Sequence, residues 1–383
     1  MDPKIVWLFI FVILYWGYCI FWGIKGAIAA KTASDYMLAG RSIPLWVFVL
    51  AATATSFSGW TFVGHPGLIF RDGFQYAYAS FYTITIPFTG VMFLKRQWML
   101  GKRFGYVTPG EMLADYFKGD GIRVLTVIVA LFFSIPYLGV QLRASGFLFN
   151  VLTDGALSVN VGMWMLSIVV FIYVASGGLR AVAYVDTLQC VLLALGITAI
   201  GFIGLDAVGG WAELKANIIT LVQNDTKITP DGYSHYIAIP GVIQFVASGP
   251  SAAGGAWTGM MVLTYMFALM GIQSAPAFSM WSFGNKNPEP FAPQQVWASS
   301  AGIGFILFFF TAIQAFAGHF LGGNKAMIDA GVGTNVFGVE SWSAKTGLFS
   351  QGNLVPEMIN LMGSTAPWLV GLLAVCALAA MQS

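Results

Sequence analysis

Charge is scarce in this sequence. Only 9% of its 383 residues are Asp, Glu, Lys or Arg, whereas soluble globular proteins carry roughly 25%. So few charged side chains cannot cover a surface in contact with water, which excludes a soluble enzyme and a disordered chain. The net charge of +2 leaves no basic patch to hold nucleic-acid phosphates. Because 57% of the residues are hydrophobic, the class that remains is a polytopic membrane protein.

Groups that carry enzyme chemistry are equally sparse. The three histidines, His65, His235 and His319, do not have the spacing of metal ligands. The three cysteines each stand alone in an apolar run, which predicts packing rather than metal binding or disulfides. No phosphate loop or nucleophile elbow is present, and no predicted span holds a pair of carboxylates. The chain is therefore predicted not to be an enzyme.

Gaps between the few charges define the membrane-spanning segments. A helix that crosses a bilayer needs about 20 predominantly apolar residues. The sequence has nine such segments, at residues 5–24, 42–70, 73–94, 124–142, 155–179, 187–205, 256–283, 296–321 and 367–383. The fold class predicted is thus an all-α polytopic membrane protein.

Lysine and arginine predict the orientation of these spans. Basic residues gather after the first span and between the third and fourth, which belong on one side of the membrane if the N-terminus is extracytoplasmic. The expected location is the plasma (inner) membrane, with long outer loops at 206–255 and 322–365. The last span reaches Ser383 without a flanking charge or turn. We therefore expect a C-terminally truncated chain that stops within a helix.

Two of the nine spans have an interrupted pattern. Residues 54–59 (ATSFSG) combine small and hydroxyl side chains in the second span, and Pro66 follows. The seventh span carries Gly271, Gln273 and Pro276. Broken helices five spans apart favour an inverted-repeat transporter with its binding site at the membrane midplane. The alternative is that Gly and Pro simply kink two ordinary membrane helices.

Neutral oxygens are the groups available at these breaks. Backbone carbonyls near Ala54 and Phe57, together with Ala380 and Ser383 in the last span, suit a hard cation. No Asp or Glu lies in the middle of a predicted span, so a proton relay lacks its carrier, and the coupling ion predicted is sodium. The alternative for each serine is a hydrogen bond to the carbonyl one turn back.

Four segments carry a family resemblance. They are residues 35–41 (DYMLAGR), residues 58–67 (SGWTFVGHPG), residues 108–117 (TPGEMLADYF) and residues 177–189 (GGLRAVAYVDTLQ). In this order they resemble the entry signature, the broken first core helix, the link after the second core helix and the loop into the fifth core helix of the sodium:solute symporter family. The resemblance implies the LeuT-type fold of two inverted five-helix repeats. Residues 1–30 would then be an extra helix, 42–206 the first repeat, 207–255 an extracytoplasmic loop, and 256–383 an incomplete second repeat of three helices.

The resemblance also implies a site. Sodium would be held by the carbonyls of Ala54, Phe57 and Ala380 and by the Ser383 hydroxyl. Asp186 matches an acid linked to sodium release, although it could instead be a helix N-cap. The residues expected to bind solute are Ser56, Ser58, Trp60, Tyr137, Gln141, Tyr265 and Gln273. In proline-transporting relatives an acid stands at the place of Ser56, so the substrate is left open.

The function predicted is secondary active transport. Inward movement of sodium would drive uptake of a small organic solute by alternating access. The sodium ion, the solute and the lipid bilayer are the expected partners, with no nucleic acid and no obligate protein partner. The alternatives are a proton-coupled carrier on the same fold, a membrane sensor or channel that does not transport, and a fragment without activity.

Overall fold

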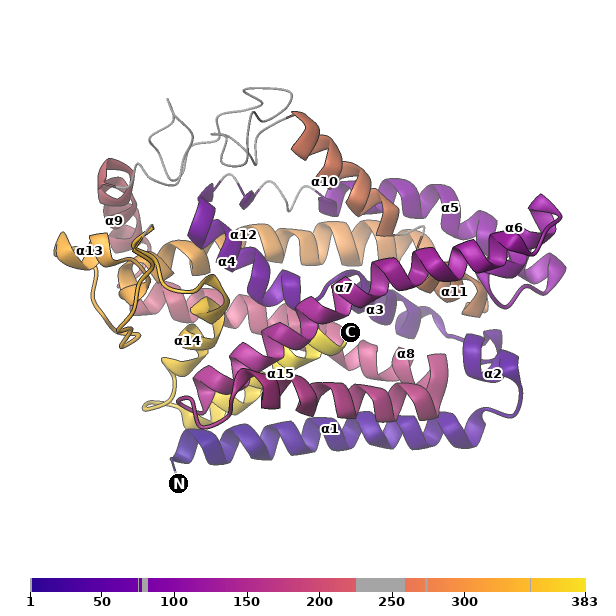
Figure 1. The fold of residues 1–383 in the computed structure, drawn as a ribbon, viewed down its shortest axis with the longest axis horizontal. Coiled ribbons are helices and arrows are strands. Elements are labelled where there is room, and N and C mark those ends of the chain that lie inside the picture. The colour runs from indigo at the N-terminus through magenta and orange to yellow at the C-terminus, as the bar shows by residue number, and fades with distance from the viewer. Residues whose placement is uncertain (1, 75, 78–81, 225–258, 273–274, 345) are drawn as a thin grey trace.

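The protein is a stack of long helices in the computed structural model (Figure 1). The structure describes residues 2–74, 76–77, 82–224, 259–272, 275–344 and 346–383. Within these ranges the regular structure is helical, apart from two isolated bridges. Helix α1 lies along one edge of the stack, and the C-terminal residue lies near the middle of the view.

The first half of the chain contains ten helical elements among the described residues. They are α1 (Pro3–Ala29), α2 (Ala33–Leu38), η1 (Ala39–Arg41), α3 (Leu45–Ser56), η2 (Trp60–Gly64), α4 (His65–Asp72), α5 (Tyr82–Phe104), α6 (Pro109–Phe117), α7 (Gly121–Leu152) and α8 (Val159–Ala207). Those of the second half are α9 (Trp211–Asn224), α10 (Gly259–Gly271), α11 (Pro276–Gly284), η6 (Pro293–Ile303), α12 (Gly304–Gly318), η7 (His319–Gly323), α13 (Lys325–Asp329), η8 (Gln351–Asn353), α14 (Leu354–Asn360) and α15 (Pro367–Gln382).

Several helices are long and apolar enough to cross a membrane. Among the described residues these are α1, α7, α8 and the continuous helix Pro293–Gly323, and the bent pair Leu45–Ser56 and Trp60–Asp72 makes a fifth candidate. Helix α15 is apolar but shorter. Predicted spans 155–179 and 187–205 both lie in α8, a helix of 49 residues. The helix is interrupted at Gly178, where φ is 58° and ψ is −159°, a conformation open to glycine but strained for other residues.

Charged residues proved poor markers of helix ends. The third span was predicted at 73–94, but α5 runs from Tyr82 to Phe104 and includes Lys95, Arg96, Lys102 and Arg103. Long basic side chains extend to the membrane interface and complement the C-terminal end of a helix, so a helix can continue through them. The predicted outer loops likewise contain helices, namely α9 in the first and α13 and α14 in the second. Residues 225–255 of the first loop lie outside the described residues.

The core is built around α8 and α15. Helix α15 is buried along most of its length, including Leu373, Ala377 and Ala380. It packs against α1, α8 and α7. Helices α1 and α8 approach closely because Gly26 faces Gly177: a Cβ at Gly26 would lie 2.4 Å from the Gly177 oxygen. Small residues at such crossings let membrane helices pack backbone to backbone.

The two ends of the stack differ. In Figure 1 the N-terminus, α9 and α13 lie at one end, and α2 and α6 lie at the other. We call the second the α2–α6 end. Arg41 ties this end together, because its guanidinium donates to the carbonyls of Gly101 (3.2 Å), Gly105 (3.0 Å) and Tyr106 (2.8 Å) at the end of α5. Tyr36 of α2 donates to the Ala175 carbonyl at 2.9 Å, close to the interruption of α8.

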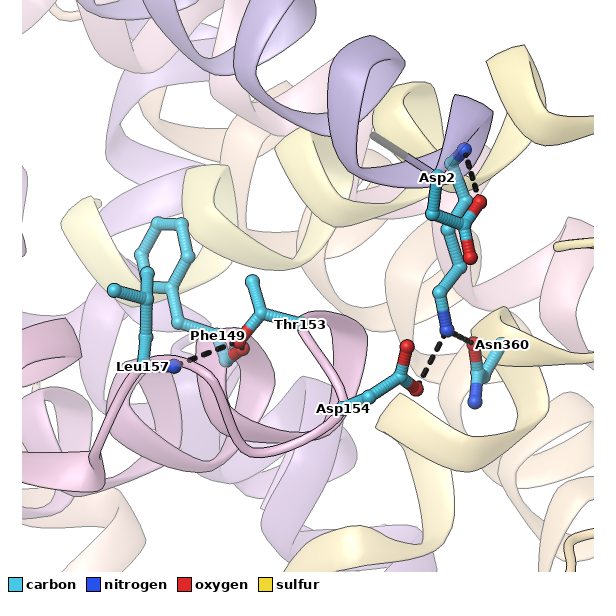
Figure 2. A network of polar contacts seen from close by, with 7 residues as sticks. Asp2, Phe149, Thr153, Asp154, Leu157 and Asn360 are labelled. Atoms are coloured by element: carbon cyan, nitrogen blue, oxygen red, sulfur yellow. Dashed lines mark hydrogen bonds and ion pairs between the residues drawn. The ribbon is translucent and has the colours of Figure 1, made fainter.

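At the opposite end a buried lysine joins three segments. The Lys4 ammonium lies 2.7 Å from Asp154 in the turn between α7 and α8, and 2.9 Å from the Asn360 amide oxygen at the end of α14. Figure 2 shows Asp154 and Asn360 converging from their separate segments. Nearby, burial raises the pKa of Glu357 to about 7, while a hydrogen bond from Asn360 and the charge of Lys4 oppose this rise. The contacts fix α14 against the start of α1.

We expect Glu357 to make stability depend on pH. Its pKa is raised from an ordinary 4.5 to about 7 in the folded protein, so between these values the folded state binds more protons than the unfolded state. The stabilisation is therefore complete below pH 4.5 and is lost as the pH rises through about 7. The melting temperature of the purified protein, measured across this pH range, should fall as the pH rises. Glu357→Gln should remove the part of this slope of melting temperature against pH that Glu357 causes.

The matched control is Glu340→Gln. Glu340 is an exposed glutamate in the same connection between η7 and α15. Its variant should keep the wild-type dependence on pH. An identical slope in wild type and Glu357→Gln would contradict the prediction.

Candidate functional site

The second span is broken at its middle, as the sequence predicts. Helix α3 ends at Ser56, and Phe57 is extended with φ −122° and ψ 146°. A wide π-helical turn, η2, follows from Trp60, and the two halves are bent by 56°. Local hydroxyls loosen the ladder: Thr55 and Ser56 donate to carbonyls one turn back, at Ala51 and Ala52. Between Ser56 and Trp60, the Phe57 carbonyl and the Gly59 amide therefore bond to side chains of neighbouring segments instead of pairing within a helix.

Three of the four oxygens predicted to hold sodium lie together. The Ser383 hydroxyl, at the end of α15, is 3.0 Å from the Phe57 carbonyl and 3.2 Å from the Ala380 carbonyl. The fourth, the Ala54 carbonyl, accepts a hydrogen bond from the Phe57 amide at 3.0 Å. Ala54, Phe57 and Ala380 are buried. Two carbonyls and a hydroxyl in a buried setting are a donor set that suits a small hard cation.

The residues predicted to bind solute divide into those at the break and those elsewhere. Gln141 of α7 accepts from the Gly59 amide at 2.6 Å, and Tyr137 lies one turn earlier on the same helix. The Ser56 hydroxyl is bonded to Ala52 in its own helix. The ring centroid of Trp60 lies 5.3 Å from that of His65. The Tyr265 side chain and Gln273 lie outside what the structure describes.

A cavity of about 770 Å³ opens beside the break. It is bounded by α7, the first part of α8 and the end of α15, and most of its lining is apolar. Tyr137, Gln141 and Ser383 bring polar groups to its wall. Large apolar cavities with a few convergent polar groups are the usual form of a small-molecule site.

Asp186 has a setting that the sequence analysis missed. It lies inside α8, eight residues after Gly178, so the helix N-cap interpretation is wrong. It is 1% exposed, and one carboxylate oxygen accepts from the Thr55 hydroxyl at 3.0 Å. The other oxygen has no hydrogen-bond partner among the described residues. The premise that no carboxylate lies within a span therefore fails for Asp186, and buried ionisable residues in membrane helices commonly mark ion paths.

A second, smaller cavity is lined by both Asp186 and Ser383. Its volume is about 300 Å³, and Thr55, Asp186 and Ser383 line it. Residues of α2 and α11, including Tyr36 and Trp281, also line it.

Gln382 was also missed. This amide is 7% exposed, has no side-chain hydrogen-bond partner within the described ranges, and lines both cavities. Its signal in the sequence was a lone polar residue directly before Ser383, at the end of an apolar run.

Comparison with known proteins agrees with this architecture. The profile of the sodium:solute symporter family matches residues 36–268. The chain is 29% identical over 195 residues to the sodium/proline symporter of Escherichia coli (strain K12), covering 48% of this chain and 37% of the relative. It is 25% identical over 238 residues to a monocarboxylate transport permease of Rhizobium johnstonii, covering 61% of this chain and 46% of the relative. The chain thus spans less than half the length of these relatives.

A solved structure supports the fold. The chain superimposes with a TM-score of 0.73 on a Na+-coupled sialic acid symporter in its substrate-bound outward-open state. The match covers 100% of this chain and 71% of that protein at 16% identity, so it establishes the fold alone. The all-helical LeuT-type fold expected from the sequence is confirmed. Since the family profile covers more than half of the chain, the protein belongs to the sodium:solute symporter family.

Proposed function

We propose that the protein couples the inward movement of sodium to the uptake of a small organic solute. The observation that carries the proposal is the cluster of the Ser383 hydroxyl with the Phe57 and Ala380 carbonyls at the break in the second span. Sodium bound there joins α15 to the point where α3 ends. Its binding therefore favours one arrangement of the broken helix.

Solute would bind beside that arrangement. The 770 Å³ cavity, with Tyr137 and Gln141 in its wall, lies against the same break. Two ligands that favour one conformation raise each other's affinity, and this reciprocity is the coupling that symport requires. The core then opens toward the α2–α6 end, sodium leaves through the smaller cavity past Asp186, and solute follows.

One sodium ion supplies enough energy for this work. A single charge that crosses 100 mV yields about 2.3 kcal/mol, and a tenfold sodium gradient adds about 1.4 kcal/mol. The sum of about 3.7 kcal/mol corresponds to accumulation of a neutral solute by roughly several hundredfold. A second ion is not needed to explain uptake against a gradient.

Solute class and orientation belong to the proposal as well. The relatives include proteins named for proline, monocarboxylates and myo-inositol, so proline, pyruvate and myo-inositol are suitable first probes. The α2–α6 end is proposed to face the cytoplasm of a cell whose plasma (inner) membrane holds the protein, because the basic loops predicted to be cytoplasmic lie there.

Asp186 favours a second candidate, a proton-coupled carrier on the same fold. A buried carboxylate with one oxygen unpaired within the described part of the chain is a group that can carry a proton. It lies beside the same cavity as Ser383. The proton and the sodium ion would therefore share a path. An experiment that changes the driving ion distinguishes sodium-coupled from proton-coupled transport.

Uptake into proteoliposomes tests both candidates. We expect at least one probe solute to accumulate under an inward sodium gradient and an inside-negative potential. Accumulation should cease when choline replaces sodium, and an inward proton gradient alone should not restore it. Uptake driven by the proton gradient in sodium-free buffer would support the second candidate instead. A thermal-shift screen of a wider solute library, with and without sodium, extends the test beyond the three probes.

A further inference from the structure

Two neighbouring segments hold the break in the second span by hydrogen bonds. On one side the Ser383 hydroxyl of α15 donates to the Phe57 carbonyl at 3.0 Å. On the other side the Gln141 side chain of α7 accepts from the Gly59 amide at 2.6 Å. The two gripped groups belong to adjacent peptide units, since Ser58 alone stands between Phe57 and Gly59. Neighbouring helices therefore hold both edges of the same short stretch of backbone.

Because of peptide geometry, these two hydrogen bonds depend on each other. Each peptide unit is planar, so the unit that contains the Phe57 carbonyl and the unit that contains the Gly59 amide are linked only through φ and ψ of Ser58. The first unit also contains the Ser58 amide, which donates to the Thr61 hydroxyl at 3.2 Å, and the second also contains the Ser58 carbonyl, which accepts from the Phe62 amide at 3.0 Å. With Gln141 on the Gly59 amide, both peptide units are held at both edges, and together these contacts restrict the direction of the Phe57 carbonyl.

The contact of Gln141 with the break is specific and buried. Gln141 is 3% exposed, and within the described part of the chain its amide nitrogen makes only a long contact, 3.4 Å, with the Tyr137 carbonyl in its own helix. Position 59 must be glycine for this approach, because a Cβ there would lie 2.7 Å from the Gln141 oxygen and 2.8 Å from Met381. The Gly59 amide is among the first donors of the second half-helix, which have no partner in their own helix.

We propose that Gln141 is a positioning residue for the sodium site. This inference rests on the proposed function. The amide oxygen of Gln141 holds the Gly59 peptide unit, and through Ser58 it sets the direction in which the Phe57 carbonyl points toward the ion. Gln141 acts on sodium through the backbone, and its oxygen is committed to Gly59 rather than to solute.

The arrangement gives solute a route to the ion. Tyr137 lies one turn from Gln141 on the same face of α7, and both line the 770 Å³ cavity. A solute that contacts this face shifts or steadies α7. Through Gln141, the same movement reaches the Phe57 carbonyl. Sodium affinity and solute affinity are thus linked by one side chain.

A sodium titration of thermal stability tests the proposal without knowledge of the solute. The purified protein is titrated with sodium chloride at constant ionic strength, with choline chloride as the replacement salt. Gln141→Leu removes the acceptor and should raise the half-saturating sodium concentration at least tenfold. Gln141→Glu keeps an acceptor oxygen at the same place and should leave that concentration no more than twofold above wild type.

Gln314→Leu is the matched control. Gln314 is a buried glutamine of α12 that also contacts a backbone group of another helix, donating to the Ile197 carbonyl at 2.9 Å. This hydrogen bond joins α12 to α8. Its variant should change the melting temperature without sodium but leave the half-saturating concentration as in wild type.

Each outcome bears on the proposal. A tenfold shift in Gln141→Leu, absent from Gln141→Glu and Gln314→Leu, supports it. A wild-type midpoint in Gln141→Leu, or equal shifts in both leucine variants, overturns it while the sodium site stands. If Gln141→Leu does not fold, a shift well above twofold in Gln141→Glu overturns it. A wild-type protein that does not respond to sodium removes the sodium site itself, and this inference with it.

Discussion

Replacing Ser383 by alanine is expected to raise the sodium concentration for half-maximal uptake by about 10- to 100-fold, because a polar contact to a charged group contributes about 1.5–3 kcal/mol. The Ser383 hydroxyl joins the Phe57 and Ala380 carbonyls, so its loss removes one oxygen and the link between α15 and the break. Expression should change far less. Sodium-dependent uptake measured over a wide range of sodium concentrations gives the result directly.

Two further variants make this expectation specific. Ser383→Thr keeps the hydroxyl and should retain most of the sodium affinity. Ser282→Ala is the matched control, because Ser282 is a buried serine whose hydroxyl also bonds a carbonyl three residues back, at Ser279 in its own helix. Its sodium dependence should equal that of wild type. If Ser383→Ala shows unchanged sodium dependence, Ser383 is not part of the site.

Those parts of the fold that depend on local composition were predictable. Long apolar runs located α1 and α7, and the small and hydroxyl residues 54–59 predicted where the second span breaks. Ends of helices were less predictable, as α5 shows by continuing to Phe104 through four basic residues. Charge at a helix end is compatible with either a loop or an extended side chain, and sequence alone does not distinguish them.

The candidate site was predictable only where its groups are close in sequence or carried by the family resemblance. The resemblance named Phe57 and Ser383 together, although 326 positions separate them. The contact between Gln141 and Gly59 was not foreseen, because an amide on α7 has no local signal for which backbone group it will meet. For Asp186 the resemblance predicts a role in sodium release, but the sequence alone did not distinguish this role from a helix N-cap. The interruption at Gly178 lies two turns before it, and the helix that follows turns this carboxylate toward Thr55.

Asp186 stands between the proposed sodium site and the α2–α6 end. Ser383, Thr55 and Asp186 line one cavity, together with Tyr36 and Trp281. A cation that leaves the carbonyls of the break meets a carboxylate oxygen there that has no hydrogen-bond partner among the described residues. A negative charge at this position lowers the energy of an ion on its way out. Asp186 is not one of the proposed sodium ligands, so this role in release does not involve the oxygens of Phe57, Ala380 and Ser383.

Asp186→Asn should therefore reduce the maximal rate of sodium-driven uptake at least tenfold, while the half-saturating sodium concentration stays at or below the wild-type value. The asparagine keeps the size of the side chain and an oxygen that accepts from Thr55, so the fold should be preserved. What it removes is the charge that attracts the departing ion. Initial rates in proteoliposomes under saturating sodium, together with a sodium titration, separate the rate of release from the affinity of binding.

Asp206→Asn provides the comparison for charge alone, because Asp206 lies exposed near the far end of the same helix. Uptake by this variant should match wild type. If both variants transport at the wild-type rate, Asp186 has no part in release. If Asp186→Asn instead raises the half-saturating sodium concentration as strongly as Ser383→Ala, the carboxylate binds the ion in its resting site. The two proposed positions along the path would then be one site, and Ser383 and Asp186 would act on the same bound ion.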